Sequence, residues 1–122
     1  MGHKILVIDD DDDIADNTRR ILSYEGFEVD TSDRVEDGLK KIEKDSPDLV
    51  LLDIMFPEGK TLGFEAALEI KKLRPNLPVF AFSAINREYA FEFQKEDVHV
   101  EEFIVKPIDS KNLVKLIKKY LE

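Results

Sequence analysis

The chain alternates between short apolar runs and longer segments in which apolar residues recur at helical spacing. The runs read as strands at Lys4–Ile8, Phe27–Thr31, Leu49–Asp53, Leu77–Ser83 and Glu102–Val105. Most of them are nearly continuous in apolar or β-branched residues, which is typical of strands buried on both faces of a parallel sheet. Phe27–Thr31 differs because its apolar and polar residues alternate, as in a half-buried strand.

A helix is predicted after each strand, with start and stop signals at most ends. The first helix begins at the aspartates 11–13 and ends at Gly26, and the second is capped by Asp33 and ends at Ser46-Pro47. The third helix runs from Phe64 to Leu73, and the fourth covers Glu88–Glu96. The last helix is capped by Asp109 or Ser110. Ile14 belongs to the apolar residues at helical spacing in the first helix, and Leu68 to those of the third.

This order predicts an α/β fold: a doubly wound, five-stranded parallel sheet with five helices and right-handed crossovers, in flavodoxin-like topology. Residues 1–122 are predicted to form one domain, with no output domain in the chain.

Composition excludes several classes of function. The formal net charge is −9, so the basic surface that nucleic acid or an anionic membrane would require is missing. The chain has no cysteine, which excludes disulfides and thiolate chemistry. No apolar stretch is long enough for a signal peptide or a membrane span, so a cytoplasmic location is expected.

Polar side chains stand at the carboxyl ends of four predicted strands, which meet at one edge of a parallel sheet. They are Asp9 and Asp10, Asp53, Ser83 and Lys106. Viewed singly, each is better explained as a cap, a turn residue or a surface residue. Together, three carboxylates would repel one another unless they bind a cation, and oxygen ligands favour Mg²⁺. Lysine and serine donors beside such a site suit a phosphoryl group.

The whole chain resembles the receiver domain of two-component response regulators. Four segments carry the resemblance: ILVIDDD with Asp9 and Asp10, LLDIMFP with Asp53, FSA with Ser83, and FIVKP with Lys106. The family likeness implies a signalling switch, not an enzyme, in which Asp53 accepts a phosphoryl group from the phosphohistidine of a histidine kinase or histidine phosphotransfer protein. It also implies self-phosphorylation from small phosphodonors.

The same likeness assigns roles around the acceptor. Asp10 and Asp53 would bind Mg²⁺ directly, together with the main-chain carbonyl of Met55, and Asp9 would act mainly through water. Ser83 and Lys106 would hold the phosphoryl oxygens. Ser83 and the aromatic Phe103 would be the switch residues, and the Lys106–Pro107 peptide is expected to be cis.

The likeness also implies that phosphorylation changes the surface made by the fourth helix, the fifth strand and the fifth helix. Three aromatic residues in the expected fourth helix, Tyr89, Phe91 and Phe93, cannot all face inward, so at least one ring is expected on this surface, where a downstream protein would bind. Met55 and Ile85 flank the pocket and are apolar, so neither can orient a water molecule, and slow self-dephosphorylation is expected.

Two features depart from the family pattern. The loop that follows Asp53, around residues 58–63, is longer than usual. His99 stands where the family often has glycine, at a position that often requires a positive φ, so an irregular fourth helix is expected.

Three other functions are less well supported than the phosphoacceptor switch. A binding-only pseudo-receiver would keep the fold without phosphorylation. A magnesium-dependent phosphohydrolase with Asp53 as nucleophile would need a second acid where Met55 stands. A flavodoxin-like cofactor binder would need a phosphate-binding loop where this chain carries aspartates.

Overall fold

The computed structural model of the protein describes residues 2–53, 62–83, 100–105 and 109–121. Five parallel strands form one sheet in the order β2-β1-β3-β4-β5. They are β1 (Lys4–Ile8), β2 (Glu28–Ser32), β3 (Leu49–Asp53), β4 (Val79–Ser83) and β5 (Glu102–Val105). The predicted flavodoxin-like α/β fold with a parallel sheet is therefore confirmed.

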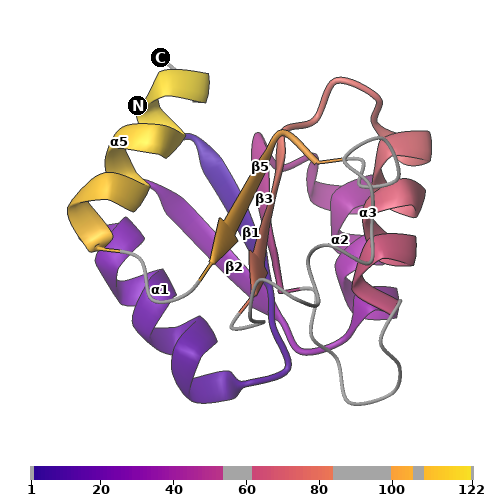
Figure 1. The fold of residues 1–122 in the computed structure, drawn as a ribbon, viewed down its shortest axis with the longest axis horizontal. Helices are drawn as coiled ribbons and strands as arrows, with labels where there is room; N and C mark the ends of the chain where they lie inside the picture. Colours follow the sequence, from indigo (N-terminus) through magenta and orange to yellow (C-terminus); the bar gives the residue numbers. More distant parts are fainter. Residues whose placement is uncertain (1, 54–61, 84–99, 106–108, 122) are drawn as a thin grey trace.

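Helices cover both faces of the sheet (Figure 1). They are α1 (Asp12–Tyr24), α2 (Val35–Asp45), α3 (Leu62–Leu73) and α5 (Ser110–Leu121). Helices α1 and α5 lie on one face, and α2 and α3 lie on the other. The helix expected over Glu88–Glu96 lies outside the described residues, as do His99 and most of the loop around residues 58–63.

The two faces of the sheet have separate hydrophobic cores, because side chains alternate between the faces along each strand. In β1, Leu6 and Ile8 pack toward α2 and α3, whereas Ile5 and Val7 pack toward α1 and α5. All five residues of β3 are buried. This explains why the runs are continuously apolar: each residue faces one core or the other.

Local chemistry accounts for most helix ends. The carboxylate of Asp11 caps α1 by accepting hydrogen bonds from the amides of Asp13 and Ile14. Gly26 follows the helix with a φ of +98°, a conformation that glycine adopts without strain. Ser46 ends α2, and the Asp109 carboxylate accepts from the Lys111 amide at the start of α5.

The prediction that Asp33 caps α2 is wrong. The cap position is Arg34, whose side chain makes no capping hydrogen bond. The hydroxyl of Ser32 lies 2.8 Å from both the Arg34 carbonyl and the Asp37 carboxylate, so this serine ties the end of β2 to the first turn of α2.

Two apolar residues of the predicted helical patterns are exposed. Ile14 is 40% exposed and Leu68 is 38% exposed. Among the side chains of α3 that the structure describes, the buried ones are Ala66, Ala67 and Ile70, and Leu68 lies about 100° around the helix from Ala67. Periodicity predicted the helix correctly but not the orientation of its face toward the sheet.

Candidate acidic site at the carboxyl ends of the strands

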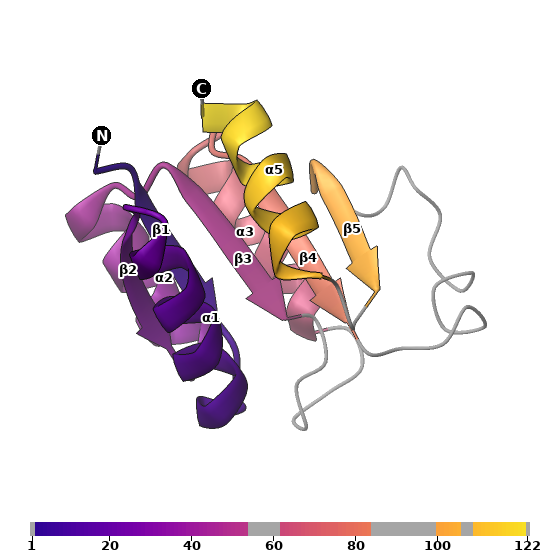
Figure 2. The ribbon, with the colours of Figure 1, turned by 90° about the vertical axis from the view of Figure 1, so that its left-hand side faces the viewer.

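The strands all point the same way, so their carboxyl ends lie along one edge of the sheet (Figure 2). Asp53 is the last residue of β3, the central strand, and is 7% exposed. Asp9 follows β1 directly and is 4% exposed, whereas Asp10 is exposed. The fold therefore presents two nearly buried carboxylates and one accessible carboxylate.

The orientation of Asp9 is fixed by its own backbone and by the start of α1. Its amide donates to the Ser32 carbonyl at 2.9 Å, which extends the pairing of β1 with β2 by one step. Its carboxylate accepts from the Asp11 amide at 2.9 Å, just before the helix that Asp11 caps. Asp9 is thus held at the junction of strand and helix.

Asp9, Asp10 and Asp53 come together as the sequence predicts. One carboxylate oxygen from each lies within 4.8 Å of the others, so the three oxygens can share one ion. The donor set consists of hard oxygen ligands, which is the chemistry that Mg²⁺ prefers. Asp10 is exposed, so one of the three carboxylates is open to solvent. The residues present fit a magnesium ion.

A hollow of about 400 Å³ adjoins this cluster. Its wall is acidic and includes Asp9, Asp12, Asp13, Asp16, Thr31, Ser32 and Asp33. The hydrogen bond from Arg19 and the nearby charge of Arg20 lower the pKa of Asp16. Sequence reasoning did not single out Ser32, a buried residue of this wall; the only sequence signal for it is a small polar residue at the end of a strand.

The other predicted site residues are described only in part or not at all. The backbones of Ser83, at the end of β4, and Phe103, within β5, are described, whereas their side chains are not. The residues of this set that lie outside the described ranges are Met55, Ile85, Tyr89, Phe91, Phe93, Lys106 and Pro107. Ser83 is paired with Val105, the residue before Lys106, which places both strand ends at the same edge as Asp53.

No helix within the described ranges has the length and apolar character needed to cross a bilayer.

The fold and the site define a flavodoxin-like α/β domain with a cluster of three carboxylates at its strand ends that is compatible with Mg²⁺. Residues 5–118 match the family described as the response regulator receiver domain. The chain belongs to this family, as the sequence resemblance predicted, and its class is the phosphoacceptor switch of two-component signalling.

Relatives agree with this assignment. The chain is 34% identical to the sensory transduction protein LytT of Bacillus anthracis over 96% of its own length and 46% of LytT. A CheY-like receiver domain protein from Methanospirillum hungatei has a TM-score of 0.86 and 31% identity, with 99% of this chain and 94% of that one covered. Response regulator TrrA from Thermotoga maritima, solved in complex with Mg²⁺ and BeF, has a TM-score of 0.82 and 31% identity over 97% and 98% of the two chains.

The chain spans about half the length of the first curated relatives that it matches.

Proposed function

We propose that Asp53 is the residue of this receiver domain that accepts the phosphoryl group. The observation that carries this assignment is the convergence of Asp9, Asp10 and Asp53 within 4.8 Å at the strand ends. Asp53 lies at the centre of the site because β3 is flanked by β1 on one side and β4 on the other. A nucleophilic carboxylate beside a cation site is the arrangement that phosphoryl transfer requires.

The residues proposed to hold Mg²⁺ are Asp10 and Asp53, with Asp9 acting mainly through water and Met55 contributing its main-chain carbonyl. When bound, the ion would neutralise the charge on the phosphoryl oxygens and orient them. The Mg²⁺ and BeF in the TrrA structure support this reading for a related domain.

In the proposed reaction, a carboxylate oxygen of Asp53 attacks the phosphorus atom of a phosphohistidine. A phosphorus–oxygen bond forms, the phosphorus–nitrogen bond breaks, and the electron pair stays on the histidine ring. Ser83 and Lys106 would hold the phosphoryl oxygens, and Ser83 with Phe103 would carry the change to the surface of the fourth helix, β5 and α5. Small phosphodonors would support the same reaction, and apolar Met55 and Ile85 would make self-dephosphorylation slow.

The proposed phosphodonor is a histidine kinase or histidine phosphotransfer protein, and the proposed output is a downstream protein bound at the switch surface. A net charge of −9 argues against direct binding of nucleic acid by this domain. The single-domain reading of residues 1–122, the five-helix form of the fold and a cytoplasmic location are parts of the same proposal.

The test is intact mass after incubation with acetyl phosphate, with and without Mg²⁺. We expect a gain of one phosphoryl group in the unmodified protein that depends on Mg²⁺ and is absent in Asp53→Asn. Asp33→Asn is the matched control, because Asp33 lines the same hollow but is outside the three-carboxylate cluster. Phosphorylation of Asp53→Asn would contradict the assignment, and no gain together with no Mg²⁺ binding would favour the binding-only pseudo-receiver.

A further inference from the structure

Glu101 lies immediately before β5, at the opposite end of that strand from the acidic site. Both of its carboxylate oxygens lie 2.5 Å from the ammonium group of Lys71, near the end of α3. One of them also accepts a hydrogen bond of 2.7 Å from the backbone amide of Val79, the first residue of β4. The Lys71 ammonium also donates to the Leu77 carbonyl at 2.7 Å. This carboxylate thus joins α3, β4 and β5.

The contact with Val79 has a specific geometric meaning. In a strand, the N–H and C=O groups of one residue point to the same side, here from Val79 toward β5. The Val79 carbonyl accepts from the Glu101 amide at 2.9 Å, and the Val79 amide donates to the Glu101 carboxylate. Glu101 therefore satisfies both backbone groups of the first residue of β4, with its backbone and its side chain.

This geometry bears on the register of β5, to which the contact of Glu102 with Tyr120 and the burial of Ile104 also contribute. The strand has four residues, lies at the edge of the sheet and pairs only with β4 among the described strands. A slip of one residue would exchange its two faces, and Glu102 could no longer reach its present partner. Glu101 and Lys71 make one register more favourable than the others.

Register at this end of β5 determines which residue reaches the site at the other end. With Glu101 opposite Val79, Val105 pairs with Ser83, and Phe82 beside it pairs with Asp53. Lys106 follows Val105 directly in the sequence. A shift of one residue moves a strand by about 3.3 Å, more than the length of a hydrogen bond.

We propose that Glu101, held by Lys71, is a positioning residue for phosphoryl transfer: it sets the register of β5 on β4 and so aligns the carboxyl end of β5 with Asp53. This role rests on the proposed function of Asp53 and adds to it a residue at the far end of the domain. Mg²⁺ binding does not depend on it, because Asp9 and Asp10 follow β1 and Asp53 ends β3.

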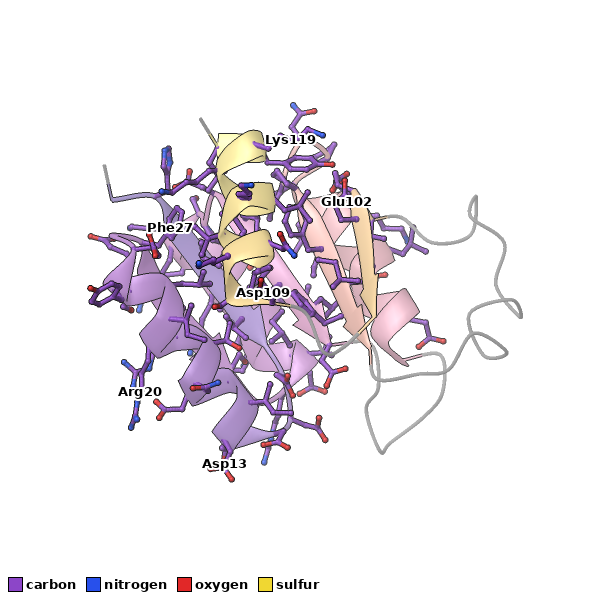
Figure 3. The ribbon with its side chains drawn as sticks, turned by 60° about the vertical axis from the view of Figure 1, so that its left-hand side comes forward. Asp13, Arg20, Phe27, Glu102, Asp109 and Lys119 are labelled. Carbon is purple, nitrogen blue, oxygen red and sulfur yellow. The ribbon has the colours of Figure 1, made fainter. Side chains whose placement is uncertain are left out.

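The neighbouring residue provides a matched control. Glu102 has the same charge but faces the other side of the sheet, where it accepts a hydrogen bond of 2.6 Å from the Tyr120 hydroxyl of α5. Figure 3 shows Glu102 near the carboxyl end of α5, at the end of the molecule opposite to Asp13. Glu102→Gln removes one charge next to Glu101 without changing the contact with Val79.

The experiment compares the unmodified protein with Glu101→Ala, Glu101→Gln and Glu102→Gln. Three quantities are measured: the rate of phosphoryl gain from acetyl phosphate, the dissociation constant for Mg²⁺, and the exchange rate of the Val79 amide. For Glu101→Ala we expect the phosphorylation rate to fall about tenfold, because the strand end is misplaced. Its Mg²⁺ affinity should stay within about twofold, and the Val79 amide should exchange faster.

Glu101→Gln keeps an oxygen that can accept from the Val79 amide, so its rate should lie between those of Glu101→Ala and the unmodified protein. Glu102→Gln should be phosphorylated like the unmodified protein. An unchanged rate in Glu101→Ala, an equal loss in Glu102→Gln, or a parallel loss of Mg²⁺ affinity would each overturn the positioning role.

Failure of the proposed function has a different signature. The unmodified protein would then gain no phosphoryl group at all. An unchanged Val79 exchange rate in Glu101→Ala would show that Glu101 does not set the register, whether or not Asp53 is phosphorylated.

Discussion

The two edges of the sheet use the same kind of side-chain pair for different purposes. At β5, Lys71 and Glu101 form an ion pair, and the Glu101 carboxylate bonds to the backbone of the neighbouring strand β4. At β2, Lys41 and Asp30 bond to backbone groups on the side of the strand that faces away from β1. Lys41 donates to the Thr31 carbonyl at 2.5 Å, and the Asp30 carboxylate accepts from the Thr31 amide at 2.8 Å.

Backbone pairing shows that the N–H and C=O groups of Thr31 point away from β1. The Glu28 amide donates to the His3 carbonyl, and the Ser32 carbonyl accepts from the Asp9 amide. The backbone N–H and C=O groups of the even-numbered residues of β2 therefore point toward β1. Val29 and Thr31 therefore direct their N–H and C=O groups to the open edge. Exposed backbone groups at an edge can pair with another strand, and charged side chains are a common protection against this. The comparison teaches that one edge is protected from new partners, whereas the other is held in register with its existing partner.

The largest effect on stability is expected at the β5 edge. Lys71→Met leaves the Glu101 carboxylate and the Leu77 carbonyl without their charged donor, which should lower the free energy of unfolding by about 2 kcal/mol. Chemical denaturation measures this change. Lys72→Met is the control, because among the described residues Lys72 makes an exposed pair with Glu69 at 3.6 Å, and its loss should change stability by less than about 0.5 kcal/mol. Equal losses of unfolding free energy in both variants would show that the contact with Glu101 stabilises the fold no more than an exposed ion pair does.

At the β2 edge, the main expected effect is on association. Lys41→Met uncovers the Thr31 carbonyl and should produce concentration-dependent self-association, measured by analytical ultracentrifugation. Lys44→Met makes the same exchange on an exposed position of α2 and should stay as monomeric as the unmodified protein. Protection of the Val29 and Thr31 amides that grows with concentration would locate the contact at this edge, and identical behaviour of the two variants would contradict the protective role.

The smallest effect is expected where α5 meets β5. The Tyr120 hydroxyl bonds to Glu102, and its ring packs edge-on against Phe80 with centroids 5.0 Å apart. The hydrogen bond to Glu102, followed by burial, raises the pKa of Tyr120 to about 12. Because the pKa is higher in the folded state, the stabilisation is complete below the unfolded pKa of about 10 and is lost as pH rises toward 12.

Tyr120→Phe should remove this part of the alkaline loss of stability while keeping the ring contact. Tyr120 is 36% exposed, so solvent screening reduces the effect to about 1 kcal/mol or less. Unfolding free energies at pH 8 and pH 11 measure it. If the unfolding free energy of Tyr120→Phe falls between these two pH values by as much as that of the unmodified protein, the hydrogen bond to Glu102 contributes nothing to the pH dependence.

Much of the site could be predicted from sequence because its parts stand at strand ends. A parallel sheet brings all carboxyl ends to one edge, so the alternation of strands and helices is enough to place Asp9, Asp10 and Asp53 together. Glu101 and Lys71 could not be paired in this way, because 30 residues separate them and neither has a local pattern that marks it as part of a pair.

The sequence by itself determined the alternation of strands and helices, the Asp11 cap, the turn at Gly26 and the acidic chemistry of the site. These depend on interactions between residues close in the chain, or on a topology with few alternatives. Tertiary structure alone decided that Ile14 and Leu68 are partly exposed, that Ser32 rather than Asp33 ties β2 to α2, and that Glu101 joins β4 to β5. The physical reason is that a helix periodicity shows which residues share a face, whereas the sheet beneath it decides which face is buried and which distant groups meet.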